Sequence, residues 1–315
     1  MGKDCVRFEN VYKKYDKNRV LRGLSFTVNE GEILALLGHN GAGKTTVLRL
    51  ILGLLEWESG EIEVFGENIR NNLDIFRKDM GVLSESTGLY ESLSVYDNLK
   101  FFAKIYDFNH NLFEEKIDYL LKKFDIFKCK NQIIKNFSQG TKKKVAIIRT
   151  LFHNPRLVLM DEPTNALDPV SVCAFHDIVK EMKQELGTSF IITTHNLDEV
   201  VKICDSVVIL KNGKSIYENK FEIGSDNTVL ETWITIYNFD IKQVDVIAEI
   251  MNKFFADVRW NMDDNRLILK NSDEALVVRL VKELVYKDIG ISDLRRNNFS
   301  LEQIYLDANM ETEND

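Results

Sequence analysis

The chain has 315 residues, 44% of them hydrophobic, with a formal net charge of −8 and a sequence pI of about 5.4. Its length favours two domains, and its apolar runs are too short to cross a bilayer, so we expect a cytoplasmic protein. The acidic balance argues against a protein that binds duplex nucleic acid, which usually presents a basic face, and no nucleic-acid partner is expected.

Two short strands are predicted near the N-terminus, at residues 5–9 and 20–28, because apolar side chains alternate or cluster there. Tyr15 lies between them, about two dozen residues before a glycine-rich loop. Two interpretations of Tyr15 stay open from the residues alone. It could stack on a nucleotide base, or it could be an amphipathic tyrosine at a strand edge, which is the commoner case.

The glycine-rich loop from Gly38 to Thr45 fits the pattern G-x-x-x-x-G-K-[ST] at every fixed position. A predicted buried strand at 33–37 leads into it, and a predicted helix begins near Lys44. The glycines let the backbone turn tightly and expose N–H groups to an anion, and the helix dipole adds positive potential. Lys44 supplies a charge for the β- and γ-phosphates, and the Thr45 hydroxyl can bind Mg²⁺. The alternative, a turn that binds nothing, leaves the Lys-Thr pair unexplained.

A largely helical stretch is predicted over residues 86–137, after strands at 60–66 and 80–83. Ser94 is a good N-cap for its first helix, with Asp97 three residues later. The buried faces of the two helices are expected to carry Leu99, Phe102 and Ile105, then Phe113, Ile117, Leu120, Leu121 and Phe124.

Another helix is predicted to start after Ser138, which suits an N-cap. The lysine run at 142–144 follows in its first turns, the wrong end of a helix for positive charge. Runs of lysine are usually solvated, so we expect these side chains at the surface.

Carboxylates and a histidine follow two further apolar strands. The predicted strand at 157–162 ends in two carboxylates, and in a chain with a phosphate loop Asp161 is placed to bind Mg²⁺. Glu162 comes next and is predicted to polarise a water molecule against the γ-phosphate. A strand that merely ends in a polar turn would explain Asp161 but not the residues after it. His195 ends the predicted strand at 189–195, where a structural histidine is the alternative. Asn212-Gly213 predicts a hairpin turn.

Taken together, these motifs resemble the ATPase domain of ABC transporters over residues 4–222. The resemblance implies an α/β, P-loop NTPase fold over residues 1–224, with a mixed sheet core, an antiparallel β subdomain and a helical subdomain at about 86–154. It identifies residues 137–141 as the family's signature and 165–168 as its aspartate loop, and it assigns Tyr15 to stacking on adenine. The implied ATP-binding residues are Tyr15, Gly38, His39, Asn40, Gly41, Ala42, Gly43, Lys44, Thr45, Thr46, Ser138, Gly140 and Asp168. The implied Mg²⁺ ligands are Thr45, Glu85 and Asp161, and the implied catalytic residues are Glu162, His195 and Glu85.

The sequence departs from the family pattern at several positions. Glu85 stands where the family commonly has glutamine, and its extra negative charge beside the γ-phosphate should increase the dependence on Mg²⁺. Gln139 and Thr141 replace a glycine and a glutamine of the signature. Ala166 replaces a glycine, which we expect to be a minor change. Because no essential group is lost, an active ATPase is expected.

The resemblance also implies partners. Two copies face each other head to tail, and each ATP contacts the phosphate loop of one copy and Ser138 and Gly140 of the other. ATP then stabilises a closed dimer, and hydrolysis releases it. The helical subdomain and the Glu85 loop would act on a polytopic permease, which holds the protein at the inner face of the cell membrane.

Residues 225–315 are predicted to form a second, small α+β domain. The predicted element order β-α-β-β-α-β suggests a ferredoxin-like unit, with helical stripes that include Ile247, Met251 and Phe254, and a short helix at 300–306. This domain resembles the C-terminal extension of exporter-type ABC ATPases. A role in regulation or dimer stability is expected, and simple structural padding is the alternative.

Three functions remain in competition. The first is the ATP-hydrolysing subunit of an ABC exporter. The second is a soluble ABC-type ATPase that acts on a ribosome or DNA complex, although such proteins usually carry two ATPase halves or a long coiled coil. The third is a nucleotide sensor without turnover, against which Glu162 and His195 both argue. The transported substrate cannot be read from this chain.

Overall fold

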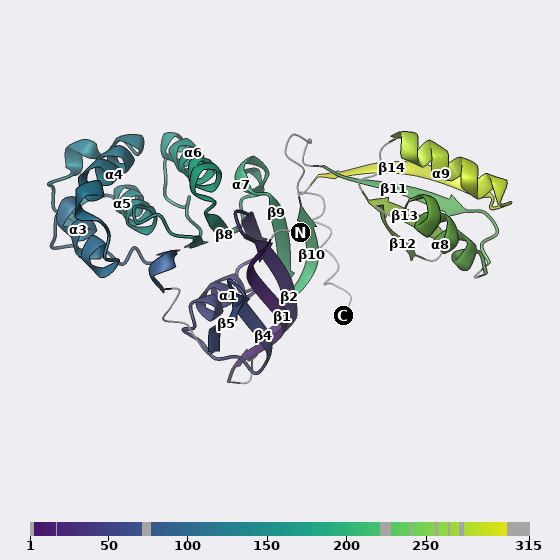
Figure 1. The fold of residues 1–315 in the computed structure, drawn as a ribbon, viewed down its shortest axis with the longest axis horizontal. Helices are drawn as coiled ribbons and strands as arrows, with labels where there is room; N and C mark the ends of the chain where they lie inside the picture. The colour runs from purple at the N-terminus through teal and green to yellow at the C-terminus, as the bar shows by residue number, and fades with distance from the viewer. Residues whose placement is uncertain are drawn as a thin grey trace. The chain divides into compact units, whose positions relative to one another are not determined.

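The computed structural model describes residues 3–16, 18–70, 77–220, 228–240, 242–255, 258–263, 265–270 and 274–300. The chain divides into two compact units, Met1–Ile223 and Gly224–Asp315 (Figure 1). Among the helices described, none is both long enough and apolar enough to cross a membrane.

The first unit contains a four-stranded antiparallel sheet in the order β2-β1-β4-β5. Its strands are β1 (Asp4–Tyr15), β2 (Asn18–Asn29), β4 (Ser59–Val64) and β5 (Glu67–Asn68). Strands β1 and β2 are longer than predicted, because they pair with each other along their whole length across several register shifts. Tyr15 therefore belongs to the end of a strand and is paired with Asn18.

A six-stranded mixed sheet forms the centre of the first unit, in the order β10-β9-β3-β8-β7-β6. Its strands are β3 (Ile33–Leu37), β6 (Met80–Leu83), β7 (Leu157–Asp161), β8 (Ser189–Thr194), β9 (Ser206–Lys211) and β10 (Lys214–Lys220). All neighbours are parallel except β9 and β10, which form the predicted hairpin around Asn212-Gly213. The mixed sheet and the separate antiparallel sheet are confirmed. The carboxyl ends of β3, β6, β7 and β8 consequently meet at one edge.

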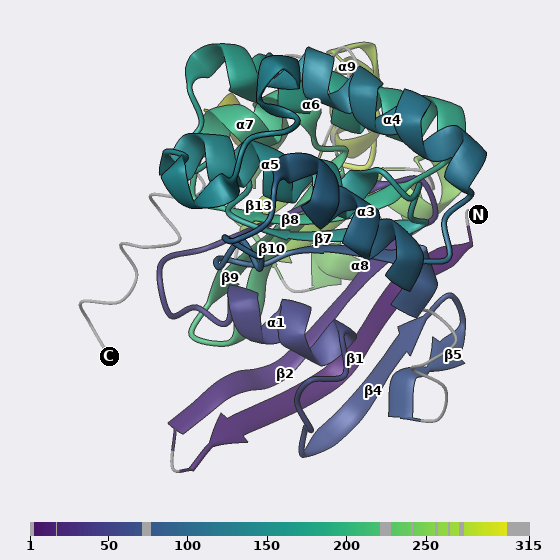
Figure 2. The same cartoon turned by 90° about the vertical axis from the view of Figure 1, so that its left-hand side faces the viewer.

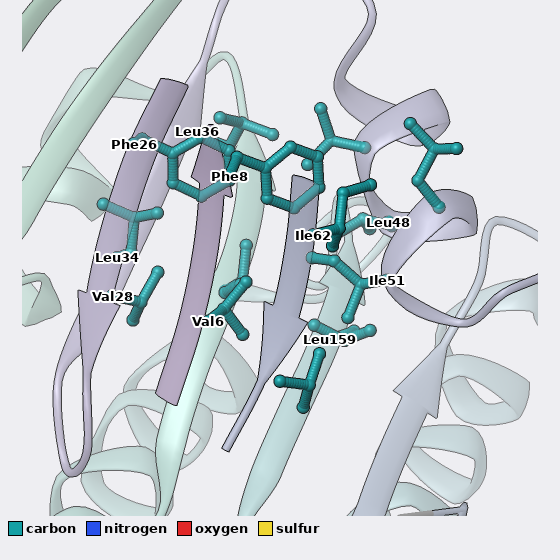
Figure 3. Close-up of a cluster of buried hydrophobic side chains, with 14 of the residues drawn as sticks. Val6, Phe8, Phe26, Val28, Leu34, Leu36, Leu48, Ile51, Ile62 and Leu159 are labelled. Atoms are coloured by element: carbon teal, nitrogen blue, oxygen red, sulfur yellow. The ribbon is translucent and has the colours of Figure 1, made fainter. Parts of the chain in front are cut away.

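Helix α1 (Lys44–Ile51) is held between the two sheets by a shared hydrophobic core (Figure 3). Leu48 and Ile51 on its inner face pack among side chains of β1, β2 and β4 on one side and of the central sheet on the other. The rings of Phe8 and Phe26 stack with centroids 4.7 Å apart within this core. Buried apolar packing of this kind, rather than the loop alone, fixes the start of α1.

Helices α3 (Val95–Ile105), α4 (His110–Lys123) and α5 (Gln139–Leu151) pack together as a helical subdomain (Figures 1 and 2). The predicted cap is confirmed, since Ser94 Oγ accepts a hydrogen bond from the Asp97 N–H at 3.0 Å. The prediction that Ile105 is buried is wrong, because it is 53% exposed. Ile105 lies six residues after Leu99 and is rotated by about 120° from it. Helices α6 (Pro169–Leu186) and α7 (Leu197–Ile203) also belong to the described part of this unit.

The second unit is a four-stranded antiparallel sheet in the order β12-β13-β11-β14, with two helices. Its elements are β11 (Thr228–Ile236), α8 (Lys242–Phe254), β12 (Arg259–Asp263), β13 (Arg266–Lys270), α9 (Glu274–Tyr286) and β14 (Ile291–Ser300). Ile247 and Met251 are buried as predicted, but Phe254 is exposed, because Phe255 lies one helical turn after Met251 and takes the buried place. The predicted helix at 300–306 starts at the last residue of β14 and otherwise lies outside the described residues.

Candidate active site

A cleft of about 560 Å³ opens at the edge where the parallel strands of the first unit end. It brings together the glycine-rich loop, the loop after β6, the end of β7 and the end of β8. Its lining residues are Val20, Asn40, Gly41, Gly43, Lys44, Thr45, Thr46, Glu85, Asp161, Glu162, Asn165 and His195. The most separated of the predicted catalytic residues, Glu85 and His195, therefore share one cavity.

The glycine-rich loop adopts a backbone that side chains other than glycine rarely tolerate. Gly41 and Gly43 have φ values of 87° and 110°, in the left-handed region. Gly38 meets a different limit, because a Cβ there would lie 2.6 Å from the Leu210 carbonyl oxygen. These glycines let the loop end directly at the first residue of α1, where free N–H groups favour an anion.

Lys44 is buried at the floor of the cleft. Its Nζ donates hydrogen bonds to the carbonyl oxygens of Gly38 at 2.6 Å and His39 at 3.2 Å. Burial lowers the pKa of Lys44, while the charges of Glu162 and Asp161 act in the opposite direction. The ammonium is thus held by two carbonyl oxygens of the loop, and Lys44 lines the cavity.

Asp161 is fixed by two hydroxyl groups. Thr45 Oγ1 donates to Asp161 Oδ2 at 2.9 Å, and Thr193 Oγ1 donates to Asp161 Oδ1 at 2.5 Å. Thr193 is fully buried in β8 and was not predicted from the sequence as a site residue. Its signal was a hydroxyl near the carboxyl end of β8, the strand that pairs with β7.

Glu162 and His195 are in contact across the ends of β7 and β8. His195 Nδ1 lies 3.0 Å from the Glu162 carboxylate, a hydrogen-bonding distance at which a protonated Nδ1 donates. Glu162 has a φ of 47°, an uncommon conformation for a residue other than glycine. Its N–H donates to the Thr193 carbonyl oxygen at 3.1 Å, so this backbone conformation is tied to β8.

The loop that carries Glu85 is held by Arg149 of α5, a residue that was not predicted from the sequence. The Arg149 guanidinium donates to the carbonyl oxygens of Val82 at 3.1 Å, Thr87 at 2.8 Å and Gly88 at 3.1 Å. Val82 precedes Glu85 and the other two acceptors follow it, so the arginine holds both ends of the Glu85 loop. Burial lowers the pKa of Arg149, yet a guanidinium stays charged at such sites.

The prediction that the lysine run lies at the surface is wrong. Lys142 and Lys143 are both buried, and only the aliphatic part of such a side chain is easily covered. The two lysines on either side of Lys143 each form an ion pair. Lys142 pairs with Glu91 at 2.5 Å, and Lys144 pairs with Asp168 at 2.9 Å. Pairing with carboxylates outweighs the unfavourable position at the N-terminal end of α5.

Several predicted site residues lie outside the set that lines the cleft. Ser138 caps α5, its Oγ accepting from the Thr141 N–H at 3.2 Å, and Gly140 follows it. A Cβ at Gly140 would lie 2.6 Å from the carbonyl oxygen of Ala166, so the signature and the aspartate loop touch there. Ala166 has a φ of 69°, so the replacement of glycine at this position is less minor than expected.

Asp168 and Tyr15 also lie apart from the cleft lining. Asp168 caps α6 by accepting a hydrogen bond from the Ser171 N–H at 2.9 Å. The pKa of Asp168 lies far below its ordinary value. The largest cause is its hydrogen bond with Lys144, and its hydrogen bonds with Ser171 add to the effect. Tyr15 is partly exposed at the end of β1, with Lys13 Nζ 5.0 Å from its ring centroid. His39 and Ala42 belong to the glycine-rich loop without lining the cavity.

The donor atoms of the cleft suit a hard cation and a phosphate chain. The Thr45 hydroxyl and the Asp161 carboxylate lie within hydrogen-bonding distance of each other, and Glu85 lines the same cavity. Mg²⁺ is usually held by one or two carboxylates together with substrate phosphates and water. The described residues contain no group of three or more His, Cys, Asp or Glu side chains that could hold a metal by themselves.

Comparisons with known proteins point to one family. The family described as ABC transporter matches residues 21–165. The uncharacterized ABC transporter ATP-binding protein YhcH of Bacillus subtilis (strain 168) is 30% identical over 98% of this chain and 97% of its own. The linearmycin resistance ATP-binding protein LnrL of the same organism is 28% identical over 96% of this chain and 97% of its own. The solved structure of cbiO1 from Clostridium perfringens, described as part of the ABC transporter complex cbiONQ, has 28% identity and a TM-score of 0.62, and covers 80% of this chain and 96% of its own.

Proposed function

The chain belongs to the ATP-binding proteins of ABC transporters, and from this premise we propose which residues hydrolyse ATP, which partners they need and in which direction cargo moves. The observation that carries the proposal is the contact between Glu162 and His195 in the cavity that also holds Lys44 and Asp161. A charged loop, a fixed carboxylate and a second carboxylate beside a histidine form a site for phosphoryl transfer to water.

Each side chain receives a role from its place. Lys44 binds the β- and γ-phosphates, and Glu162 accepts the hydrogen bond of the attacking water and orients it. His195 holds the Glu162 carboxylate and reaches toward the γ-phosphate. Thr45 and Asp161, with Glu85, would hold Mg²⁺, and the ion would supply positive charge that offsets the charge of the phosphate chain.

A second copy of the chain is proposed to complete the site. Ser138 is exposed and Gly140 partly so, and neither lines the cleft of its own chain, although both belong to the family's signature. The N-terminus of α5, where they lie, offers N–H groups and a positive dipole end. In a head-to-tail dimer these groups would contact the γ-phosphate of the ATP bound to the partner. The proposed stacking of Tyr15 on adenine closes the other side of the nucleotide.

The helical subdomain is proposed to receive a separate, membrane-spanning permease. Tyr90, Phe101 and Ile105 are exposed near the Glu85 loop, and the rings of Tyr90 and Phe101 meet with centroids 4.9 Å apart. Exposed aromatic side chains in one patch are typical of a docking surface. Binding of the permease there would hold the protein at the inner face of the membrane and couple the partner's movement to Glu85.

Export is the proposed direction of transport. YhcH and LnrL match this chain nearly from end to end, second unit included, and LnrL is named for resistance to linearmycin. We propose a ferredoxin-like arrangement for that unit, supported by its strand order, and a role in dimer stability or regulation. The alternative, an ATPase acting on a ribosome or DNA complex, has no further support. Co-purification with a polytopic membrane protein rather than with ribosomes would separate the two.

The experiment that tests the ATPase site is the Glu162→Gln variant. We expect phosphate release to fall by about 10²- to 10⁴-fold, because the group that orients water loses its negative charge. Glu67→Gln in β5 is the matched control and should hydrolyse ATP at the wild-type rate, since Glu67 is exposed and does not line the cleft. Size-exclusion chromatography with Mg-ATP should show a dimer of Glu162→Gln. Equal rates of phosphate release for wild type and Glu162→Gln would refute the assignment of Glu162.

A further inference from the structure

Negative charge is concentrated in the cleft. Glu85, Asp161 and Glu162 line it together with the Lys44 ammonium. Since ATP adds further negative charge, a third carboxylate on the Glu85 loop should weaken nucleotide binding unless another cation offsets it. Lys143 is the described residue whose position fits that cation.

The register of α5 places Lys143 near the carboxyl ends of β6 and β7. Thr150 lies two helical turns after Lys143 on the same face, and its Oγ1 donates to the Val82 carbonyl oxygen at 3.1 Å. Helix and strand pack closely there, since a Cβ at Gly81 would lie 2.4 Å from the Thr150 carbonyl oxygen. The chain then proceeds to the amino end of β6, where the Arg156 N–H donates to the Asp79 carbonyl oxygen. Lys143 consequently lies toward the opposite, carboxyl end.

Distances along the two elements agree with this placement. Seven helical residues rise by about 10 Å, which carries the helix from Thr150 back to Lys143. Three extended residues also span about 10 Å, which carries the chain from Val82 to Glu85. Leu83 of β6 pairs with Met160 of β7, so Asp161 and Glu162 continue at the level of the Glu85 loop.

The charges around Lys143 match the geometry. Its side chain is only 7% exposed, and burial lowers the pKa of Lys143. Asp161, Glu162, Glu85 and Glu199 act in the opposite direction, in that order of size. Lys142 and Lys144 on either side are engaged by other acids, Glu91 and Asp168. The charge of Lys143 instead interacts with Asp161, Glu162 and Glu85, the three carboxylates that line the cleft.

We propose that Lys143 is a second cation of the nucleotide site, a positioning residue that offsets the extra carboxylate of Glu85. Lys143 is not among the residues that line the cavity, and it acts on the nucleotide through the carboxylates in front of it. The proposal rests on the proposed function, because it takes the cleft as the ATP site. It also changes the expectation for Glu85, whose charge would raise the Mg²⁺ requirement only where Lys143 is absent.

A double-mutant cycle tests the proposal with full-length protein. Binding of ATP is measured by calorimetry in the presence of EDTA, so that charge is read without Mg²⁺ and without turnover. We expect Lys143→Gln to weaken binding by about tenfold and Glu85→Gln to strengthen it by about threefold. Additive effects would leave the double variant about threefold weaker than wild type. The offset predicts coupling instead, so Lys143→Gln should cost at most about threefold in the Glu85→Gln background, and the double variant should bind ATP like wild type. Lys142→Gln is the matched control, a neighbouring buried lysine with its own partner, and should bind ATP like wild type.

The outcomes separate this inference from the proposed function. If the wild-type protein does not bind ATP at all, both the proposed function and the role of Lys143 are wrong. Wild type that binds and hydrolyses ATP, with Lys143→Gln equal to Lys142→Gln in affinity, would overturn the role of Lys143 alone. Thermal unfolding of each nucleotide-free variant reports whether it is folded. If Lys143→Gln does not fold, Glu85→Gln still decides, because an affinity for ATP equal to that of wild type in EDTA contradicts the offset.

Discussion

Replacement of Arg149 by lysine should loosen the loop that carries Glu85. The guanidinium makes three hydrogen bonds, to the carbonyl oxygens of Val82, Thr87 and Gly88, from a largely buried position. An ammonium keeps the charge and the aliphatic stem but cannot reach three acceptors arranged for a planar fork. Loss of two such bonds, each worth about 1–1.5 kcal/mol, gives an expected decrease in the free energy of unfolding of about 2–3 kcal/mol.

The assay combines a global and a local measurement. Urea unfolding followed by circular dichroism gives the free energy, and hydrogen exchange at residues 82–90 reports the loop itself. Arg7→Lys is the control, because Arg7 is exposed and its ion pairs with Glu9 and Glu63 lie at the surface, where such a change costs less than about 0.5 kcal/mol. Exchange in the loop at the wild-type rate, together with a loss of stability no larger than that of Arg7→Lys, would show that the three bonds do not hold the loop.

Two further changes test the surroundings of the site. Gly140→Ala should lower the free energy of unfolding by about 1–3 kcal/mol, because the new Cβ would lie 2.6 Å from the Ala166 carbonyl oxygen. Gln139→Ala, at the adjacent exposed position, is the control and should change the stability little. Equal losses for the two variants in urea titrations would contradict the close contact at Gly140. Burial lowers the pKa of His153 to about 4, below its value of 6.5 in an unfolded chain, so the unfolded chain takes up the proton first as the pH falls. The contribution of neutral His153 to the free energy of unfolding is complete above about pH 6.5 and is lost toward pH 4. Between pH 7 and 5 the wild type should therefore lose about 1.5 kcal/mol more stability than His153→Phe, a control that keeps a ring stacked on Tyr106. Parallel pH profiles of stability for the two proteins would refute the shift in the pKa of His153.

The parts of the site that could be predicted from the sequence are those set by local chemistry. The glycine-rich loop needs glycines at fixed spacing and a lysine at the start of a helix, and these requirements are visible within eight residues. Asp161 and His195 could be predicted to lie together because they end apolar strands, and parallel strands in one sheet end at one edge. The helix caps at Ser94 and Ser138 were equally local.

The parts that could not be predicted depend on packing between distant segments. In the sequence Arg149 is simply a basic residue in the last turn of a helix. Its hydrogen bonds to the Glu85 loop exist only because α5 packs against the loop after β6. The lysine run was predicted to be solvated because no acidic residue lies near it in the sequence. The carboxylates that interact with it, Glu91, Asp168 and those of the cleft, come from distant segments. The predictions that Ile105 and Phe254 are buried failed for another reason. Each is the last residue of its helix and points away from the buried stripe, which the spacing of apolar residues near a helix end does not reveal.

Helix α5 joins the proposed partner site to the chain's own cleft. Ser138 at its N-terminus is proposed to face the ATP of the partner, Lys143 lies behind the carboxylates of its own cleft, and Arg149 holds the loop of Glu85. These three residues span eleven positions of one helix, about 17 Å along its axis, and buried packing resists bending over such a length. A shift of the N-terminus when the second copy closes would therefore move the Lys143 charge and the Glu85 loop together. If the second copy closes as proposed, the state of one nucleotide would be transmitted through this one helix to the other site and to the proposed permease surface.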